Sequence, residues 1–294
     1  MMTSGQYRDS LDDLHLDVYI RGNRVRNARD NPVICRSLDE AARTYEMAQM
    51  PEYEQTMVAI SHISGTRINR FNHISQDIDD LIKKDQLNRL FNGNNGHCFQ
   101  RTLGMNTLNA LSITTGDIDA AYGTIHHGRF LKYLAHIQEN DLTCDASLVD
   151  PRGNGWLPPH MQSNPDLLLH EVGETSNGVM LRGVKACGIS ALTSHEILVV
   201  PTTAMTERDD AYAIFFALPT DAEGVTFVID PESHTATRSG GGIVDRAAAA
   251  FRGHQALCVF DAVIVPWERI FMYRECEFCE QMADLYKLSF CFDA

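Results

Sequence analysis

Residues 256–271 of this 294-residue chain read Ala-Leu-Cys-Val-Phe-Asp-Ala-Val-Ile-Val-Pro-Trp-Glu-Arg-Ile-Phe. The run up to Phe260 is apolar and contains residues that favour buried strands. After Asp261 a second apolar run continues to Pro266, and a Trp-Glu-Arg turn follows. Because proline cannot donate to a strand ladder, it marks the end of the run. The stretch predicts a buried β-strand over 257–265 inside a larger sheet.

The surrounding sequence from Asp141 to Phe271 has a similar pattern of short apolar runs separated by turn residues. The other predicted strands are 179–186, 197–200, 212–218 and 225–229. Upstream, residues 1–140 look helical, and 274–290 look helical again. The order predicts an α+β fold with three parts: an N-terminal helical domain (1–140), a middle β-domain (141–271) and the start of a truncated C-terminal helical domain (272–294).

Local signals place the helices of the first part. Ser37 to Glu40 forms a capping-box pattern, and we expect the helix that it opens to end before Pro51. A second helix is expected from Ser75, with the acidic run 77–80 in its first turn. Its predicted apolar stripe consists of Ile78, Leu81, Ile82 and Leu90. Two more helices are expected over 98–121 and 124–139.

Composition restricts the function classes. The net charge of −14 and the pI near 5.2 argue against nucleic acid and anionic membrane surfaces, which need a basic face. The N-terminus lacks the apolar core of a signal peptide, and no apolar run approaches the roughly 20 residues of a membrane span. The eight cysteines are dispersed, so a disulfide framework is not expected and a cytoplasmic location fits best.

Two polar loops are candidate ligand sites. The segment 140–155 joins the helical part to the β-part, and its glycines and Arg152 could offer donors to a pyrophosphate or a ring carbonyl. The segment 183–196 lies between two predicted strands and carries small residues and hydroxyls. Taken alone, each pattern is explained more simply as an ordinary connection between elements, and His195-Glu196 as structural.

The cysteines give weaker signals. Cys98 near a helix N-terminus is a plausible metal or redox ligand, although a free cysteine in a helix is usually a packing residue. Cys276 and Cys279 form a single CxxC without a second pair at zinc-site spacing. A site built from Cys98, Cys276, Cys279 and Cys291 is a remote alternative.

Together these segments resemble a flavoprotein family, that of the 4-hydroxybutyryl-CoA dehydratase/vinylacetyl-CoA isomerases and the 4-hydroxyphenylacetate 3-monooxygenases. The resemblance runs from about Gln6 to about Phe278. The residues that carry it are Thr44-Tyr-Glu-Met-Ala48, Ile68-Asn-Arg-Phe71, Cys98-Phe-Gln-Arg101, Ile137-Gln-Glu-Asn-Asp-Leu142, Asp150-Pro151, Lys185-Ala186, Ser194-His-Glu196, Ala204-Met-Thr-Glu207 and Val259-Phe-Asp261.

The resemblance implies an acyl-CoA dehydrogenase-like fold, in which FAD lies between the β-domain and helical bundles. By the resemblance, the FAD-binding residues map onto two loops: Leu148, Val149, Asp150, Pro151, Arg152, Gly153, Asn154 and Gly155 in the first, and Cys187, Gly188, Ile189 and Ser190 in the second. This favours a flavin site over the simpler interpretation of both loops.

The dehydratase branch also implies a [4Fe-4S] cluster held by three cysteines and one histidine. The first cysteine maps onto Cys98 and the second onto Thr102, which is not a cluster ligand. The histidine position falls near Cys291, and the last cysteine beyond Ala294. Because Cys98 alone survives, we expect no [4Fe-4S] cluster.

The monooxygenase branch implies an Arg and a His that hold a phenol. Arg101 could match the Arg, and Asp145 stands where the His would be. Neither active site is complete in this chain.

The resemblance further implies a C-terminal helical bundle that builds a homotetramer, and we expect that bundle to be absent here. Three functions remain open: an FAD-dependent 4-hydroxybutyryl-CoA dehydratase-like protein acting on an acyl-CoA, a flavin-dependent aromatic hydroxylase acting on a phenolic substrate, and a catalytically inactive remnant or one subunit of a split enzyme. The last would need a complementary C-terminal subunit.

Overall fold

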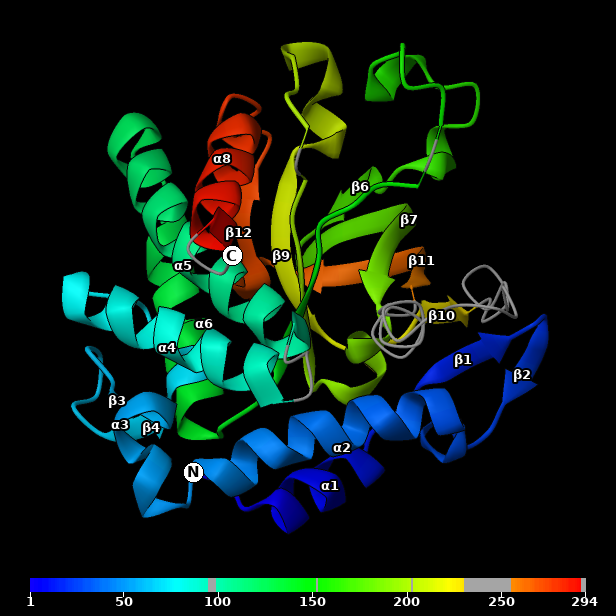
Figure 1. The fold of residues 1–294 in the computed structure, drawn as a ribbon. Coiled ribbons are helices and arrows are strands. Elements are labelled where there is room, and N and C mark those ends of the chain that lie inside the picture. Colours follow the sequence, from blue (N-terminus) through cyan, green and yellow to red (C-terminus); the bar gives the residue numbers. More distant parts are fainter. Residues whose placement is uncertain (95–98, 152, 202, 230–254, 292–294) are drawn as a thin grey trace.

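The computed structural model describes residues 1–94, 99–151, 153–201, 203–229 and 255–291. Two β-sheets face each other at its centre (Figure 1). The six-stranded sheet has the order β2-β1-β10-β11-β7-β6, and the four-stranded sheet has the order β12-β9-β8-β5. The strands of the first are β1 (Asp17–Ile20), β2 (Asn23–Val25), β6 (His170–Thr175), β7 (Gly178–Gly188), β10 (Val225–Ile229) and β11 (Gln255–Pro266). Those of the second are β5 (Cys144–Ser147), β8 (Glu196–Val199), β9 (Ile214–Pro219) and β12 (Ile270–Tyr273).

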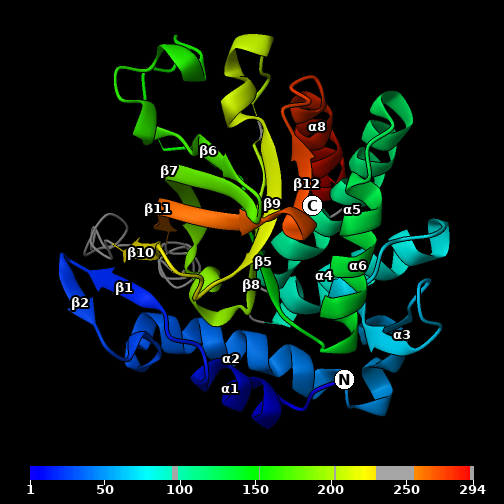
Figure 2. The ribbon, with the colours of Figure 1, turned by 180° about the vertical axis from the view of Figure 1, so that it is seen from behind.

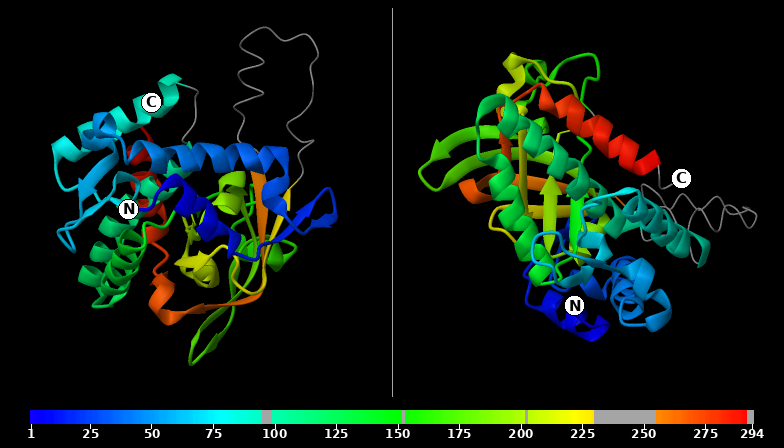
Figure 3. Two further views of the ribbon diagram at one scale, coloured as in Figure 1. Left: turned by 90° about the horizontal axis from the view of Figure 1, so that it is seen from below. Right: turned by 90° about the vertical axis from the view of Figure 1, so that its left-hand side faces the viewer.

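Helices cover the sheets from two sides. In Figure 1, α1 (Ser4–Asp12) and α2 (Pro32–Met47) run along the lower edge of the sheets, and the view from below shows α2 crossing that edge (Figure 3). On the side of the four-stranded sheet that faces away from the six-stranded sheet lie α5 (Phe99–Tyr122), α6 (His126–Glu139) and α8 (Phe278–Cys291), to the right of the strands in Figure 2. The short α3 (Glu54–Met57), the hairpin of β3 (Val58–Ile60) and β4 (Arg67–Asn69), and α4 (Ile78–Asn94) complete the helical side.

The four-stranded sheet is buried on both faces, and β9 shows why. Ile214, Phe216 and Leu218 enter the core between the two sheets. Phe215 and Ala217 enter a second core that α5, α6 and α8 share. A strand covered on both sides needs a continuous apolar sequence, which is why residues 214–218 contain no polar residue.

β11 contains a bulge where its apolar pattern changes phase. Ala256, Cys258 and Phe260 are buried before it, and Val263 and Val265 are buried after it. The pairing with β7 shifts between Phe260 and Val263, and Ala262 has a φ of 55°. The extra residue lets both apolar runs face the same core, which explains why Asp261 interrupts the sequence without ending the strand.

The predicted capping box at Ser37 is wrong. The helix begins five residues earlier at Pro32, a residue well suited to a first helical turn. Ser37 is buried inside α2, and its hydroxyl lies 3.1 Å from the Thr193 hydroxyl. The serine therefore serves a contact between α2 and the β-part rather than a helix start.

The predicted start and stripe of α4 are also corrected. The cap is Asp77, which accepts a hydrogen bond from the Asp80 amide at 2.9 Å, so the acidic run does lie at the helix N-terminus as expected. Ile78 and Ile82 are 75% and 49% exposed, whereas Leu87 is fully buried. α4 turns a partly polar face inward, because Lys84 donates a hydrogen bond to the Ser289 carbonyl of α8.

The N-terminal part is less purely helical than the sequence suggests. β1 pairs in parallel with β10, from Asp17 beside Thr226 to Ile20 beside Ile229. The hairpin of β1 and β2 thereby becomes one edge of the six-stranded sheet. Residues near the start of the chain thus belong to the sheet that we predicted from residues 141–271 alone.

Candidate functional site

The structure brings the two predicted flavin loops side by side, because β5 leads into one and β7 leads into the other. Just beyond β5, Val149 forms a bridge with Ala186 of β7, whose amide donates to the Val149 carbonyl at 2.7 Å. The Ser147 hydroxyl donates to the Ala186 carbonyl at 2.9 Å. These backbone contacts join the four-stranded sheet to the six-stranded sheet at the site.

Asp145 and Ser190 make a second connection between the same two segments. The Ser190 hydroxyl donates to Oδ2 of Asp145 at 2.8 Å, and both side chains are buried. Oδ1 of Asp145 has no hydrogen-bond partner among the described residues. Burial raises the pKa of Asp145 to about 7, against the opposing effect of hydrogen bonds from Ser190 and the Ala146 amide. The carboxyl therefore keeps its proton up to a much higher pH than an ordinary aspartic acid side chain does.

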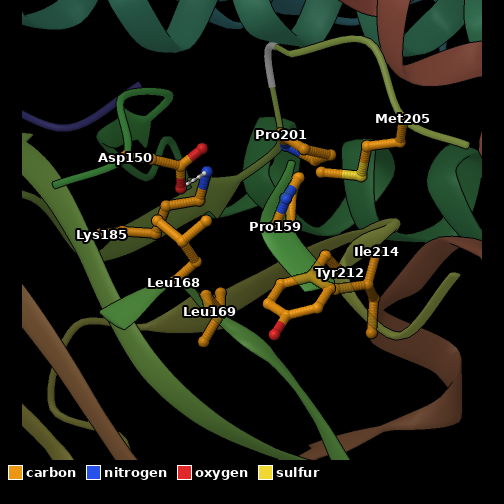
Figure 4. A pocket seen from close by; sticks show the side chains of 9 residues that line it. All are labelled: Asp150, Pro159, Leu168, Leu169, Lys185, Pro201, Met205, Tyr212 and Ile214. Carbon is orange, nitrogen blue, oxygen red and sulfur yellow. Dashed lines mark ion pairs between the residues drawn. The ribbon is translucent and has the colours of Figure 1, made fainter. Parts of the chain in front are cut away.

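Asp150 and Lys185 make the third connection, an ion pair of 2.7 Å. The Lys185 side chain is only 4% exposed, and its Nζ also donates to the Val200 carbonyl at 3.3 Å. Figure 4 shows this pair on one side of a small pocket, with Met205 and Tyr212 on the opposite side. We call the contacts of Asp145, Ser147, Val149 and Asp150 with β7 and Ser190 the loop frame.

The first loop is folded tightly beyond the frame. Gln162 accepts a hydrogen bond from the Asn154 amide and donates to its carbonyl, both at 3.0 Å. A Cβ on Gly153 would lie 2.6 Å from Gln162 Oε1 and 2.7 Å from Leu167 Cδ2, so a larger residue would have to displace the ends of these two side chains. A Cβ on Gly155 would meet nothing within 4 Å. Arg152 lies outside the described residues.

The exposed members of the two loops are few. Leu148, Cys187, Ile189 and Ser190 are buried, whereas the Val149 side chain is 60% exposed and Gly153, Asn154 and Gly155 are exposed. Pro151 and Gly188 are half-buried. In this arrangement the second loop leaves its backbone at Gly188 partly accessible to a ligand. The side chains of Cys187, Ile189 and Ser190 are buried below it.

Helices of the N-terminal part brace the second loop. Its last residues begin the 3₁₀ turn η6 (Ile189–Thr193). The buried Tyr7 hydroxyl of α1 donates to the Thr193 carbonyl. His195 accepts a hydrogen bond from the Thr143 amide at 3.0 Å through Nδ1 and contacts the Ser10 hydroxyl at 2.9 Å through Nε2. Burial lowers the pKa of His195 to about 4, so the ring is neutral at pH 7 and acts as a structural link.

Glu196, like His195, makes structural contacts. Its carboxylate forms a two-pronged ion pair with Arg269, at 2.7 and 3.3 Å. The pair joins β8 to the turn after β11, and the Glu196 side chain is 4% exposed.

Arg101 lies within the helical part. Its guanidinium is 4.5 Å from the Tyr45 ring centre and 4.6 Å from that of Phe71, and it donates to the Thr44 hydroxyl at 2.7 Å. The side chain is 2% exposed. These contacts include neither flavin loop, and the predicted role in substrate binding stays a prediction.

The cysteine candidates do not converge in the described part of the chain. Cys98 lies outside it, as does the side chain of Cys291. Cys276 and Cys279 are buried at the start of α8, and Cys279 Sγ lies 3.7 Å from the sulfur of Met205. Burial raises the pKa of Cys276 to about 11. Among the described residues, no group of three or more His, Cys, Asp or Glu could hold a metal ion.

Comparison with known proteins identifies the family. The profile of the family described as "4-hydroxyphenylacetate 3-hydroxylase N terminal" matches residues 3–272. The chain belongs to this family. A 4-hydroxybutyryl-CoA dehydratase/vinylacetyl-CoA-Δ-isomerase from Clostridium aminobutyricum is 41% identical over 287 residues, which are 97% of this chain and 59% of that protein. The oxygenase component of a 4-hydroxyphenylacetate 3-monooxygenase from Thermus thermophilus is 25% identical over 282 residues, 94% of this chain and 56% of that protein.

Solved structures confirm the expected fold. An oxygen-tolerant 4-hydroxybutyryl-CoA dehydratase from N. maritimus superposes with a TM-score of 0.88 at 34% identity, covering 98% of this chain and 57% of that one. The oxygenase component of 4-hydroxyphenylacetate 3-monooxygenase complexed with FAD gives a TM-score of 0.79 at 23% identity, covering 98% and 58%. The chain thus spans less than two thirds of the length of these relatives. No helix in the described ranges is long and apolar enough to cross a membrane.

Lys185 and Asp145 are the two site residues whose importance the sequence did not reveal. One signal was present for Lys185: it occupies an inward position of an alternating strand, where a charge needs a partner. For Asp145 the resemblance indicated only that it stands where the monooxygenase branch has a His. Its burial could not be foreseen, because it depends on the packing of β5 between the two cores.

Proposed function

We propose that this chain forms the N-terminal and middle parts of an FAD-dependent 4-hydroxybutyryl-CoA dehydratase-like flavoprotein. The observation that carries the proposal is the loop frame, which holds the two segments with the family's flavin pattern side by side. The 41% identity to a 4-hydroxybutyryl-CoA dehydratase supports this reading over the monooxygenase reading, for which the identity is 25%.

The site suits FAD in its shape and donors. An apolar side chain at Val149 and exposed glycine backbone at Gly153 and Gly155 let a flat ring system and a pyrophosphate approach closely. The backbone at Gly188 would face the same ligand from the second loop. Bound FAD would supply the electron-transfer chemistry, and the residues of this chain would hold and orient it.

We infer no [4Fe-4S] cluster in this chain. Position 102 of α5, four residues after Cys98 in the sequence, is a buried threonine that cannot act as a thiolate ligand. Reconstitution with iron and sulfide, followed by iron analysis and visible absorption, should detect no bound cluster. Stoichiometric iron with a brown absorption would contradict the inference.

The acyl-CoA substrate, the family-type homotetramer and a complementary C-terminal subunit belong to the same proposal. The substrate assignment follows the dehydratase relative. The complementary subunit is part of the proposal for the case of a split enzyme, and this chain spans 59% and 56% of the lengths of two relatives. The competing hypothesis is a catalytically inactive remnant. Such a protein would have the same flavin site and bind FAD but would not turn over a substrate.

Titration with FAD tests the flavin site. The purified chain should quench flavin fluorescence saturably and retain the visible absorption of FAD through gel filtration. Gly155→Val, which fills the open approach to the first loop, should weaken binding without loss of stability. The absence of saturable binding in the wild-type chain, alone and with a C-terminal fragment of a dehydratase relative, would overturn the proposal.

Turnover separates the dehydratase from its alternatives. Conversion of 4-hydroxybutyryl-CoA to a product lighter by one water by the chain with FAD and the complementing fragment, detected by mass spectrometry, would favour the dehydratase. Hydroxylation of 4-hydroxyphenylacetate with reduced flavin would favour the monooxygenase instead. FAD binding without either reaction would favour the remnant.

A further inference from the structure

Lys185 is a buried cation at the junction of three elements. It rises from β7, forms the ion pair with Asp150 after β5, and donates to the Val200 carbonyl after β8. It thereby touches the six-stranded sheet, the first flavin loop and the four-stranded sheet. Because a buried ammonium ion without a partner is costly, the position of Asp150 is strongly constrained.

The fixed position of Asp150 determines which of the side chains of residues 149 and 150 points outward and which points into the protein. Successive residues of an extended chain point to opposite sides. Val149 pairs with Ala186 and points outward, 60% exposed, while Asp150 points inward to Lys185. A slip of one residue would exchange the two sides. It would then place Val149 against the buried ammonium and leave that charge unpaired.

The neighbouring backbone hydrogen bond does not distinguish the correct register from the slipped one. The hydrogen bond from the Ala186 amide to the Val149 carbonyl joins main-chain atoms, which every residue possesses. A slipped segment could form an equivalent bond with another carbonyl. The charge pair distinguishes one register from the other, because one position alone of the segment 148–151 carries a carboxylate.

We propose that Lys185 is a positioning residue for the flavin, because its ion pair with Asp150 sets the register of the segment that FAD meets. This inference rests on the proposed flavin site. Lys185 is buried beneath the loop, so it acts on FAD through Asp150 and not by direct contact. The pair keeps an apolar side chain and the following glycine backbone on the ligand side of the loop.

The test compares FAD binding by three variants with the wild-type chain. Lys185→Met keeps the length of the side chain and removes its charge, and Asp150→Asn keeps the shape of its partner. If the loop adopts the correct register in a tenth of the molecules, the apparent dissociation constant for FAD rises about tenfold in both. The visible circular dichroism of bound FAD should also change. Lys185→Arg keeps the charge and should restore both binding and spectrum.

The matched control is Arg269→Met, which breaks the Arg269–Glu196 pair. This pair has a similar length and burial, with Glu196 4% and Arg269 22% exposed against 4% and 19% for Lys185 and Asp150. It lies in the β-part but makes no contact of the loop frame. Arg269→Met should lower the melting temperature and leave FAD affinity and the circular dichroism of bound FAD unchanged.

The outcomes separate this inference from the flavin site itself. A wild-type chain that binds no FAD overturns the proposed function. Wild-type binding together with unchanged affinity and spectrum in Lys185→Met overturns the positioning role alone, as does an equal loss in Arg269→Met. If Lys185→Met fails to fold, Asp150→Asn decides: unchanged FAD binding by that variant overturns the inference.

Discussion

The buried carboxyl of Asp145 links the stability of the site to pH. Its pKa is raised from 3.8 to about 7 in the folded chain because of burial. The unfolded chain releases this proton near pH 4, whereas the folded chain keeps it until about pH 7. Between these values the unfolded state binds fewer protons, so the contribution of Asp145 to folding stability is present at pH 4 and is lost as the pH rises to 7.

Asp145→Asn should therefore stabilise the chain at neutral pH. Asparagine stays uncharged and can still accept the hydrogen bond of Ser190, so the variant avoids a cost of up to roughly 4 kcal/mol at pH 7.5. Urea unfolding at pH 5 and pH 7.5 should show a smaller loss of stability over this range in Asp145→Asn than in the wild-type chain.

Asp261→Asn provides the control for this measurement. The Asp261 side chain is 78% exposed and pairs with Arg182 at 3.3 Å, so its removal should leave the pH dependence almost unchanged. An identical pH dependence in wild-type and Asp145→Asn proteins would show that Asp145 does not hold its proton in the folded state.

At single positions, the sequence indicated candidate residues better than it indicated which residues they contact. The two loops are predicted to bind flavin because their residues follow a family pattern, and this assignment stays a prediction. The Asp150–Lys185 pair could not be predicted, because the two residues lie far apart in the sequence and meet only when β5 and β7 are joined. Ser37 illustrates the same limit, since its partner Thr193 comes from the β-part.

Among the elements, α5 packs closely against β5 at Gly104. A Cβ on Gly104 would lie 2.2 Å from the Cys144 carbonyl oxygen, a backbone atom that cannot move away independently. The helix therefore lies against the strand that carries Asp145 into the site. Glycine at position 104 sets how closely the helical part approaches the loop frame.

Gly104→Ala should destabilise the chain by about 1–3 kcal/mol, because the added methyl group forces α5 away from β5. Thermal unfolding monitored by circular dichroism measures the change. The shift would also move the strand that precedes the first flavin loop, so FAD affinity should fall with stability.

Gly116→Ala in the same helix is the matched control. The nearest atom to its added Cβ is 3.9 Å away, and alanine favours a helix interior over glycine by up to about 1 kcal/mol. This variant should be neutral or more stable. If the two substitutions have equal effects, the close approach of α5 to β5 does not occur in solution.

Strands were predicted well where they are buried, because a buried strand has a recognisable run of apolar residues. β9 and β11 could be located because covered strands need apolar residues. β1 and β2 could not, because they have only four and three residues, and a parallel partner such as β10 leaves no local sign. The α4 stripe failed because a buried lysine, Lys84, finds a carbonyl on α8.

The two sheets differ in how they are covered. The four-stranded sheet lies between two cores, but the outer face of the six-stranded sheet carries Leu257 and Ile264 at 41% and 47% exposure. These side chains share one face because they alternate with buried neighbours along β11 and its bulge. Grouped apolar side chains on a surface favour association.

Leu257→Thr together with Ile264→Thr should reduce self-association of the purified chain at little cost in stability, because threonine suits an exposed strand position. Light scattering and the binding of a hydrophobic dye would measure the effect. Val263→Thr, one residue away but facing the core, should instead cost about 1–3 kcal/mol and leave association unimproved. Unchanged scattering in the double variant would contradict the expectation.

The pairing of β1 with β10 has a consequence for biosynthesis. Asp17 lies beside Thr226, so β1 leaves the ribosome long before its neighbour β10 emerges. Closing so long a loop is slow, and until then the early hairpin has an unprotected edge. Chaperone capture during translation should accordingly be strongest before residue 229 is exposed and should decline once β10 and β11 have emerged.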